Sequence, residues 1–165
     1  TSALAFGGDT PSLTANTELW NGTNWTEVNN LNTARETLAG AGATNTAALA
    51  FGGQAPSITA ATETWNGTNW TEVNDLNQSR KSLAGAGTNT SALAFGGNFP
   101  PSAETTLTEK WNGTNWTEVG DMSTAKELLA GAGASTAALA FGGDPGATLT
   151  EEFTDPGTIT KTLTS

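Results

Sequence analysis

Apolar residues occur along the chain in short runs that return at a nearly fixed interval. The run Ala-Leu-Ala-Phe-Gly-Gly occupies residues 3–8, 48–53, 92–97 and 138–143. The run Trp-Asn-Gly-Thr-Asn-Trp-Thr-Glu-Val occupies residues 20–28, 65–73 and 111–119. A third run, Leu-Ala-Gly-Ala-Gly, begins at Leu38, Leu83 and Leu129. Copies are 44 to 46 residues apart, so the chain is a tandem array of near-identical units.

Each unit is predicted to form four short strands. In the second unit they cover residues 38–43, 47–51, 60–65 and 69–73. Asn66-Gly67 joins the last two strands and favours a tight β-hairpin, because both residues tolerate positive φ. Residues 33–39 have helical propensity, but the glycines that follow would interrupt a helix. We therefore predict no helix there.

Four strands in about 45 residues is the spacing of β-propeller blades. The inner strands of a propeller crowd around its axis, so the small residues of Leu-Ala-Gly-Ala-Gly suit that position. The outer strands diverge and need bulk, and all six tryptophans occupy them. The predicted fold is all-β, a propeller of four-stranded antiparallel blades, with residues 1–165 forming one domain.

Both ends of the chain depart from the repeat. The units cover approximately residues 1–32, 33–77, 78–122 and 123–165, and the first lacks an inner strand. The last has Phe153 where Trp is expected and less regular strands at 148–154 and 158–163, as terminal repeats often do. This gives fifteen strands and an exposed edge in the first unit. We expect a homo-oligomer in which two chains close one eight-bladed ring. A four-bladed ring and the end of a longer array remain open.

The repeated positions resemble the kelch motif, in which an apolar strand ends in Gly-Gly and is followed by an acidic residue, two aromatic residues and a basic residue. In the second unit these are Gly52-Gly53, Glu63, Trp65, Trp70 and Arg80. Trp replaces the usual Tyr before the turn, and the turn is shorter. The Asn-, Thr- and Gly-rich copies also resemble repeat proteins of marine phage virions. The resemblance implies a kelch-like propeller and leaves its function open, because such propellers host many activities.

One acidic and one basic residue recur in each unit, and we predict that they form structural ion pairs. The acidic residues share a strand face with the Trp two positions later, and a carboxylate buried between blades needs a partner. The predicted participants are Glu18, Glu63, Glu109, Arg35, Arg80 and Lys126. A catalytic carboxylate pair is the alternative, but an active site is normally unique and these acids recur in every unit.

Composition narrows the possible functions. The 165 residues include 16 acidic and 6 basic side chains, a net charge of −10, and no His, Cys or Tyr. An acidic protein is a poor sequence-independent partner for nucleic acid or for anionic membranes. Without His and Cys there is no Ser-His-Asp triad, thiolate nucleophile or zinc–thiolate site. The copper chemistry of kelch-like galactose oxidase, which uses Tyr, His and Cys, is also excluded. We expect no enzyme, no metal and no cofactor.

The favoured hypothesis is a binding and structural module of a virion or an extracellular surface. Its ligand would be a glycan or a surface protein, bound through the variable segments 9–16, 54–61, 98–106 and 144–149. The candidate ligand-binding residues are Trp20, Asn24, Trp65, Asn69, Trp111 and Asn115. For the tryptophans, packing between blades is the competing interpretation. The alternatives are a ligand-free structural or engineered scaffold and, least favoured, a glycoside hydrolase with a unique acid pair.

Overall fold

The computed structural model describes residues 2–101, 103–146, 148–155 and 161–163, and regular structure within these ranges is entirely β. Sheet 1 contains β1 (Ala3–Phe6), β2 (Thr17–Trp20) and β3 (Trp25–Val28). Sheet 2 contains β4 (Ala39–Thr44), β5 (Ala47–Phe51), β8 (Thr62–Trp65) and β9 (Trp70–Val73). Sheet 3 contains β10 (Ala84–Thr88), β11 (Ser91–Phe95), β14 (Thr108–Trp111) and β15 (Trp116–Glu118). Sheet 4 contains β16 (Glu127–Ala134), β17 (Ala137–Asp144), β18 (Thr150–Thr154) and β19 (Lys161–Leu163).

Two short hairpins lie between the second and third strands of sheets 2 and 3. In sheet 2 the hairpin is formed by β6 (Gln54–Ala55) and β7 (Ser57–Ile58), and in sheet 3 by β12 (Asn98–Phe99) and β13 (Ala103–Glu104). The all-β class is confirmed, and residues 33–39 are not helical. Of the predicted strand 158–163, Lys161–Leu163 forms β19, and residues 158–160 lie outside the described ranges.

Within each large sheet the strands follow one another in chain order and pair antiparallel. The register in sheet 2 places Phe51 opposite Thr62 and Trp65 opposite Trp70. The Gly-Gly turn therefore leaves the sheet at one end, and the Asn-Gly hairpin lies at the other. Gly52 and Gly53 have φ values of 67° and 101°, a backbone region that glycine enters without steric cost.

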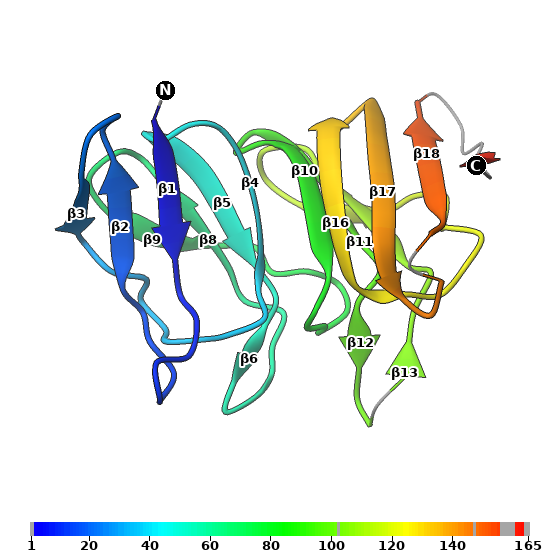
Figure 1. Cartoon of the computed structure of the whole chain (residues 1–165), viewed down its shortest axis with the longest axis horizontal. Coiled ribbons are helices and arrows are strands. Elements are labelled where there is room, and N and C mark those ends of the chain that lie inside the picture. Colours follow the sequence, from blue (N-terminus) through cyan, green and yellow to red (C-terminus); the bar gives the residue numbers. More distant parts are fainter. Residues whose placement is uncertain (1, 102, 147, 156–160, 164–165) are drawn as a thin grey trace.

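The four sheets follow one another in chain order across the molecule, with sheet 1 and sheet 4 at its two ends (Figure 1). The glycine-containing inner strands β4, β10 and β16 lie side by side. A Cβ atom added at Gly85 of β10 would lie 2.6 Å from the carbonyl oxygen of Gly40 in β4. One added at Gly131 of β16 would lie 2.6 Å from the carbonyl oxygen of Gly85. Small residues are needed here because successive backbones are almost in contact.

We expect Gly85→Ala to lower the free energy of unfolding by about 1–3 kcal/mol, the usual effect of overpacking. The new methyl group would meet both the Gly40 carbonyl and, at 2.7 Å, the ring of Phe51. Gly40→Ala is the matched control, since its closest neighbour is the ring of Phe6 in the end sheet, which has more room to move. Urea unfolding of both variants measures whether Gly85→Ala loses more unfolding free energy than Gly40→Ala. An equal loss in the two variants would contradict the prediction.

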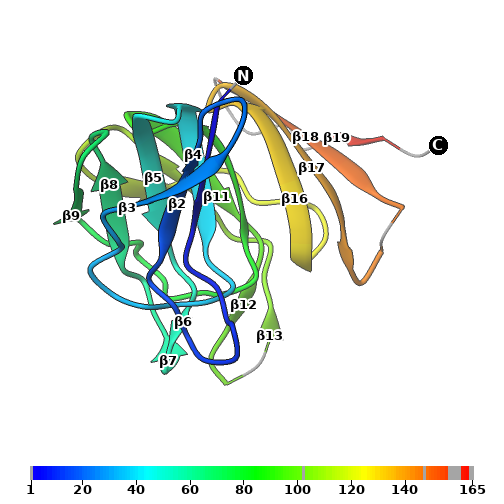
Figure 2. The ribbon, with the colours of Figure 1, turned by 60° about the vertical axis from the view of Figure 1, so that its left-hand side comes forward.

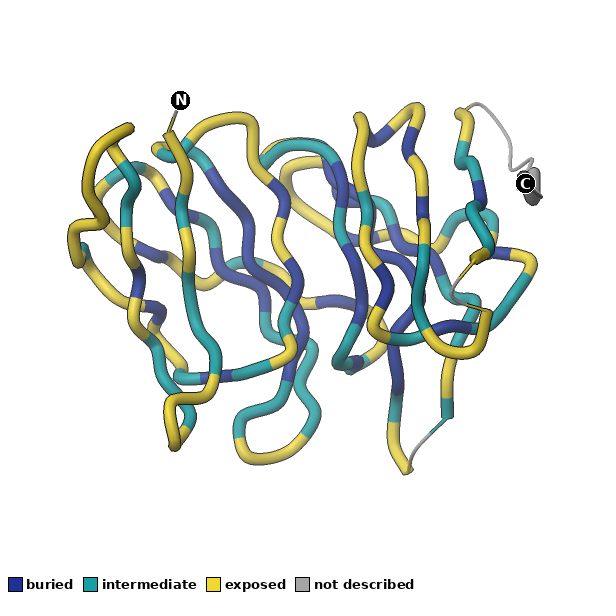
Figure 3. The backbone as a smooth tube through the Cα atoms, in the orientation of Figure 1, coloured by how far each residue is buried: buried dark blue, intermediate teal, exposed yellow. Residues whose placement is uncertain are grey.

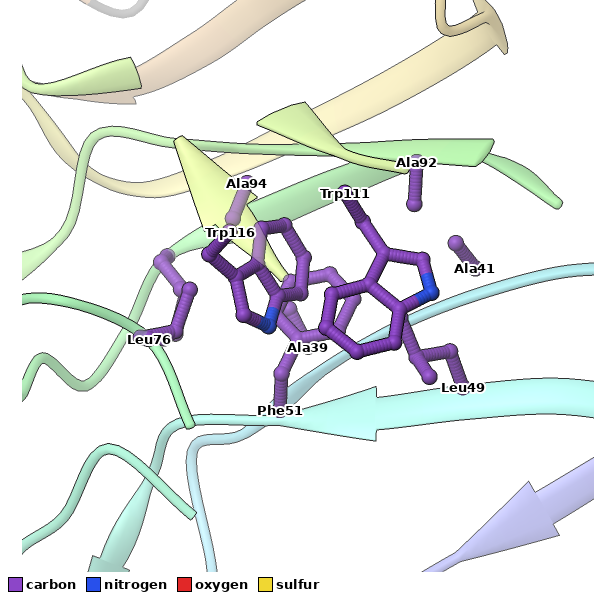
Figure 4. Close-up of a cluster of buried hydrophobic side chains, with 10 residues drawn as sticks. Ala39, Ala41, Leu49, Phe51, Leu76, Ala92, Ala94, Trp111 and Trp116 are labelled. Carbon is purple, nitrogen blue, oxygen red and sulfur yellow. The ribbon is translucent and has the colours of Figure 1, made fainter. Parts of the chain in front are cut away.

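The hydrophobic core consists of three clusters, one between each pair of successive sheets. In the middle cluster, Trp111 and Trp116 of sheet 3 lie over Leu49 and Phe51 of sheet 2 (Figure 4). Burial is therefore greatest in sheets 2 and 3, and exposed positions are frequent in the two end sheets (Figure 3). The core lies between the sheets because each strand turns one set of alternating side chains toward each neighbour.

Candidate functional site

The segments that differ most between units all emerge at one end of the molecule. They connect the second strand of each sheet to the third. Hairpins β6–β7 and β12–β13 project from the sheets at this end, as does the loop that contains the Asp9–Leu13 bridge (Figures 1 and 2). Each loop has an exposed proline near its tip: Pro11, Pro56, Pro100 with Pro101, and Pro145. We call these loops together the variable surface of an otherwise repetitive framework.

Backbone hydrogen bonds attach this variable surface to the framework. Gly53 donates its N–H to the carbonyl oxygen of Arg80 at 2.8 Å, and Gln54 and Glu36 exchange two backbone bonds of 2.9 and 3.1 Å. The Lys81 ammonium donates to Gln54 Oε1 at 2.8 Å. The loop bases are therefore ordered by neighbouring units, which leaves sequence variation to the tips.

Ion pairs join each connection between sheets to the following sheet. Arg35 Nη2 lies 3.1 Å from Glu63 Oε1, Arg80 Nη2 lies 3.0 Å from Glu109 Oε1, and Lys126 Nζ lies 3.9 Å from Glu151 Oε1. All six side chains are at most 1% exposed. Each carboxylate also accepts backbone N–H bonds, from Asn32, from Asn77, and from Ser123 and Thr124. The repeated charges therefore join each sheet to the connection that precedes it.

The Arg80 guanidinium has more hydrogen-bond acceptors around it than the other two cations. It donates to the carbonyl oxygens of Gly96 and Leu107 at 2.8 and 2.9 Å, as well as to Glu109. Burial lowers the pKa of Arg80 and Arg35, and the facing carboxylates oppose that shift. Both guanidinium groups stay charged at neutral pH, because the ordinary pKa of arginine is so high.

Glu18 does not form the predicted ion pair. It is exposed, and no cation pairs with it in the part of the chain that the structure describes. The structure pairs each glutamate with the cation of the connection that precedes its sheet, and sheet 1 has no such connection among the described residues. Arg35 pairs with Glu63, 28 positions later, and not with Glu18 of its own unit.

Two of the predicted ligand-binding tryptophans are inaccessible. Trp65 and Trp111 are each 1% exposed, and their indole N–H groups donate to the carbonyl oxygens of Asn45 and Asn89. This corrects the expectation that they present an aromatic face to a ligand, because the preceding sheet already covers it. Trp20, in the end sheet, is half-buried against Trp25 with ring centroids 5.5 Å apart.

The predicted asparagines remain at the surface, at the end opposite the variable loops. Asn24, Asn69 and Asn115 are exposed in the hairpins between the two Trp strands. The amide oxygens of Asn69 and Asn115 accept hydrogen bonds of 2.8 Å from Asn29 and Asn74 of the preceding sheet. Their position is fixed by the hairpin, since Asn66 Oδ1 accepts the N–H groups of Thr68 and Asn69.

Sequence reasoning overlooked residues that connect neighbouring sheets. Asn29 and Asn74 bond to the following hairpin, and Thr17 and Thr62 accept the indole N–H groups of Trp70 and Trp116 at 3.0 and 3.2 Å. Each pair recurs at an interval of 45 residues in the sequence, so the repeat itself was the available signal. Their partners are about 40 to 54 positions away, which no local pattern indicates.

In the described ranges, no three acidic side chains gather closely enough to hold a metal ion. Nor does the described part of the chain contain a helix of the length and apolarity needed to span a membrane. A comparison with models of known protein families and with curated proteins finds no match to this chain.

Proposed function

We propose that the chain is a kelch-like β-propeller module without enzymatic activity, which binds a glycan or a surface protein on a virion or cell surface through its variable loops. The observation that carries this proposal is the concentration of sequence differences at one end of a nearly identical framework. Loops held by a rigid scaffold are where proteins commonly place recognition. The inner strands lying side by side support the propeller geometry.

The charge of the loops limits the kinds of ligand that they can bind. Asp9, Glu104 and Asp144 are exposed on the variable surface, and Lys81 is the cation hydrogen-bonded at its base. With a net charge of −10, this surface repels polyanions. Exposed prolines with the half-buried Phe99 offer apolar contacts. A neutral glycan or an uncharged or basic protein surface suits this end of the molecule.

The repeated carboxylates argue against hydrolysis. Glu63, Glu109 and Glu151 are fully buried, paired and bonded to backbone N–H groups. General acid catalysis requires a carboxyl group within hydrogen-bond reach of the substrate. These groups stabilise the fold, so we expect their replacement to change the stability of the protein and not to abolish a catalytic activity.

Exchange of the loops tests the binding proposal. We expect replacement of the loop tip 99–104 by the tip 55–58 to leave the free energy of unfolding within about 0.5 kcal/mol, as surface changes usually do. The same exchange should reduce binding to glycan arrays and to host-cell preparations at least tenfold. Thr23→Ala, in an exposed hairpin at the opposite end, is the control and should bind as the parent does.

A ligand-free structural scaffold is the second candidate. It is favoured by the contacts between sheets that the repeated buried ion pairs and the Phe–Trp pairs make. A scaffold would bind nothing on the arrays and would keep all its measurable behaviour after the loops are exchanged. That outcome would replace the binding proposal.

A further inference from the structure

Each contact between sheets has two unlike sides. Toward the next sheet, a sheet presents the Leu and Phe of its second strand, as sheet 2 does with Leu49 and Phe51. Toward the previous sheet, sheets 2 and 3 each present two Ala and two Trp. Sheet 3 presents Ala92, Ala94, Trp111 and Trp116, and sheet 2 presents Ala48, Ala50, Trp65 and Trp70. We name these the Leu/Phe face and the Ala/Trp face.

An aromatic contact of defined geometry lies in the first two of these interfaces. Phe6 meets Trp70, and Phe51 meets Trp116, both edge to face with ring centroids 4.9 Å apart. The indole N–H then reaches the threonine opposite the phenylalanine, Thr17 or Thr62. The interface is thus specific in geometry as well as apolar.

In the part of the chain that the structure describes, the two end sheets each leave one of these faces open. Leu139 and Phe141 on the Leu/Phe face of sheet 4 are 40% and 39% exposed, although their counterparts Leu49 and Phe51 are fully buried. Trp25 on the Ala/Trp face of sheet 1 is 48% exposed, although Trp70 and Trp116 are 5% exposed. The two faces lie at opposite ends of the molecule (Figure 1), so one chain does not bring them together.

Glycine contacts identify the same open side of sheet 4. A Cβ atom at Gly52 or Gly96 would lie 2.7 or 2.8 Å from a carbonyl oxygen of the following connection. At Gly142, the equivalent position in sheet 4, a Cβ atom would meet nothing within 4 Å among the described residues. Among the described residues, this side of sheet 4 is therefore open where sheets 2 and 3 are covered by the connection that follows them.

We propose that the Leu/Phe face of sheet 4 docks on the Ala/Trp face of sheet 1 in a second copy of this chain. Trp25 of one copy would pack edge to face on Phe141 of the other. Its indole N–H would point at Thr150, which pairs with Phe141 as Thr62 pairs with Phe51. Each copy has one face of each kind, so two copies satisfy both and close into a ring of eight sheets.

This contact is weaker than the internal ones for two reasons. Sheet 1 has no inner strand in the described structure, and Glu18 on its Ala/Trp face would meet no cation from a connection. Each copy also carries a net charge of −10, and this repulsion is screened by salt. We therefore expect a reversible dimer that is favoured by physiological ionic strength over low ionic strength. The inference does not depend on ligand binding by the loops.

Native mass spectrometry at micromolar concentration tests the proposal on the whole chain. The expected mass is twice 16.7 kDa. Trp25→Ala and Phe141→Ala should each give monomers with unchanged far-ultraviolet circular dichroism, because both side chains are exposed in the single chain. Thr26→Ala, an exposed neighbour of Trp25 whose side chain points to the other face of β3, should remain dimeric. A monomeric parent protein would overturn the proposal.

Mixing the two variants tests the head-to-tail arrangement. The Trp25→Ala copy retains Phe141, and the Phe141→Ala copy retains Trp25, so one intact contact can form between them. The two variants differ in mass, and we expect a mixed dimer whose population rises with concentration. If either variant alone stays dimeric, or if no mixed dimer forms up to the solubility limit, the two faces do not bind each other.

Discussion

Replacing Arg80 with methionine is expected to lower the free energy of unfolding by about 3–5 kcal/mol, the typical cost of breaking a buried ion pair. The variant leaves Glu109 charged and buried without its cation. It also removes the donors for the carbonyl oxygens of Gly96 and Leu107. Urea unfolding, followed by tryptophan fluorescence, measures the loss.

Two comparisons make this prediction specific. Lys110→Met removes a partly exposed ion pair with Asp155 and should cost no more than about 1 kcal/mol. The double variant Arg80→Met with Glu109→Leu should recover a large part of the loss, because it leaves no unpaired charge. A loss at Arg80 as small as that at Lys110 would show that the buried pair does not hold sheet 3 to its connection.

Trp116→Ala is expected to cost about 3–5 kcal/mol, as for other buried aromatic residues truncated to alanine. Trp116 packs on Phe51 and on Trp111, with ring centroids 4.9 and 5.4 Å away, and donates to Thr62. Its removal opens a cavity between sheets 2 and 3. Urea unfolding followed by circular dichroism measures the effect without relying on the emission of the deleted residue.

Trp25→Ala is the matched control, because Trp25 occupies the same position of the repeat in sheet 1. Both substitutions are made in a Phe141→Ala background, so that association between copies does not contribute. Trp25 is 48% exposed, and we expect a loss of about 1 kcal/mol or less, because nearly half of its surface is already in water. Equal losses at the two positions would contradict the role assigned to the neighbouring sheet.

Much of the fold was predictable because it depends on local preferences. The Asn-Gly hairpin, the Gly-Gly turn and the alternation of the strands appear in the structure close to their expected positions, for example β5 at Ala47–Phe51. The three-stranded form of sheet 1 in the described residues was also predictable, since β1 at Ala3–Phe6 is the second strand of the repeat. The hairpins β6–β7 and β12–β13 were not predicted, since the variable loops differ from unit to unit and have no repeated pattern.

The pairing and burial of the candidate site residues were less predictable than the strands. The sequence indicated that Glu63 and Arg80 belong to a set of ion-paired residues, but it did not indicate which members pair. The variable loops were identified by their differences, whereas the burial of Trp65 and Trp111 became evident only in the structure. An indole in an outer strand has the same local surroundings whether a ligand or another sheet covers it.

The sequence by itself determined the repeat, the strands of each unit and the turns between them, because these follow from the φ preferences and alternation of nearby residues. Only the tertiary structure decided which copies of a repeated residue are buried or paired. Trp25 and Trp116 have the same motif around them, and Glu18 and Glu63 likewise, yet their environments differ. The physical reason is that burial and charge pairing come from the adjacent sheet, and within the described residues sheets 1 and 4 each have a neighbour on one side only.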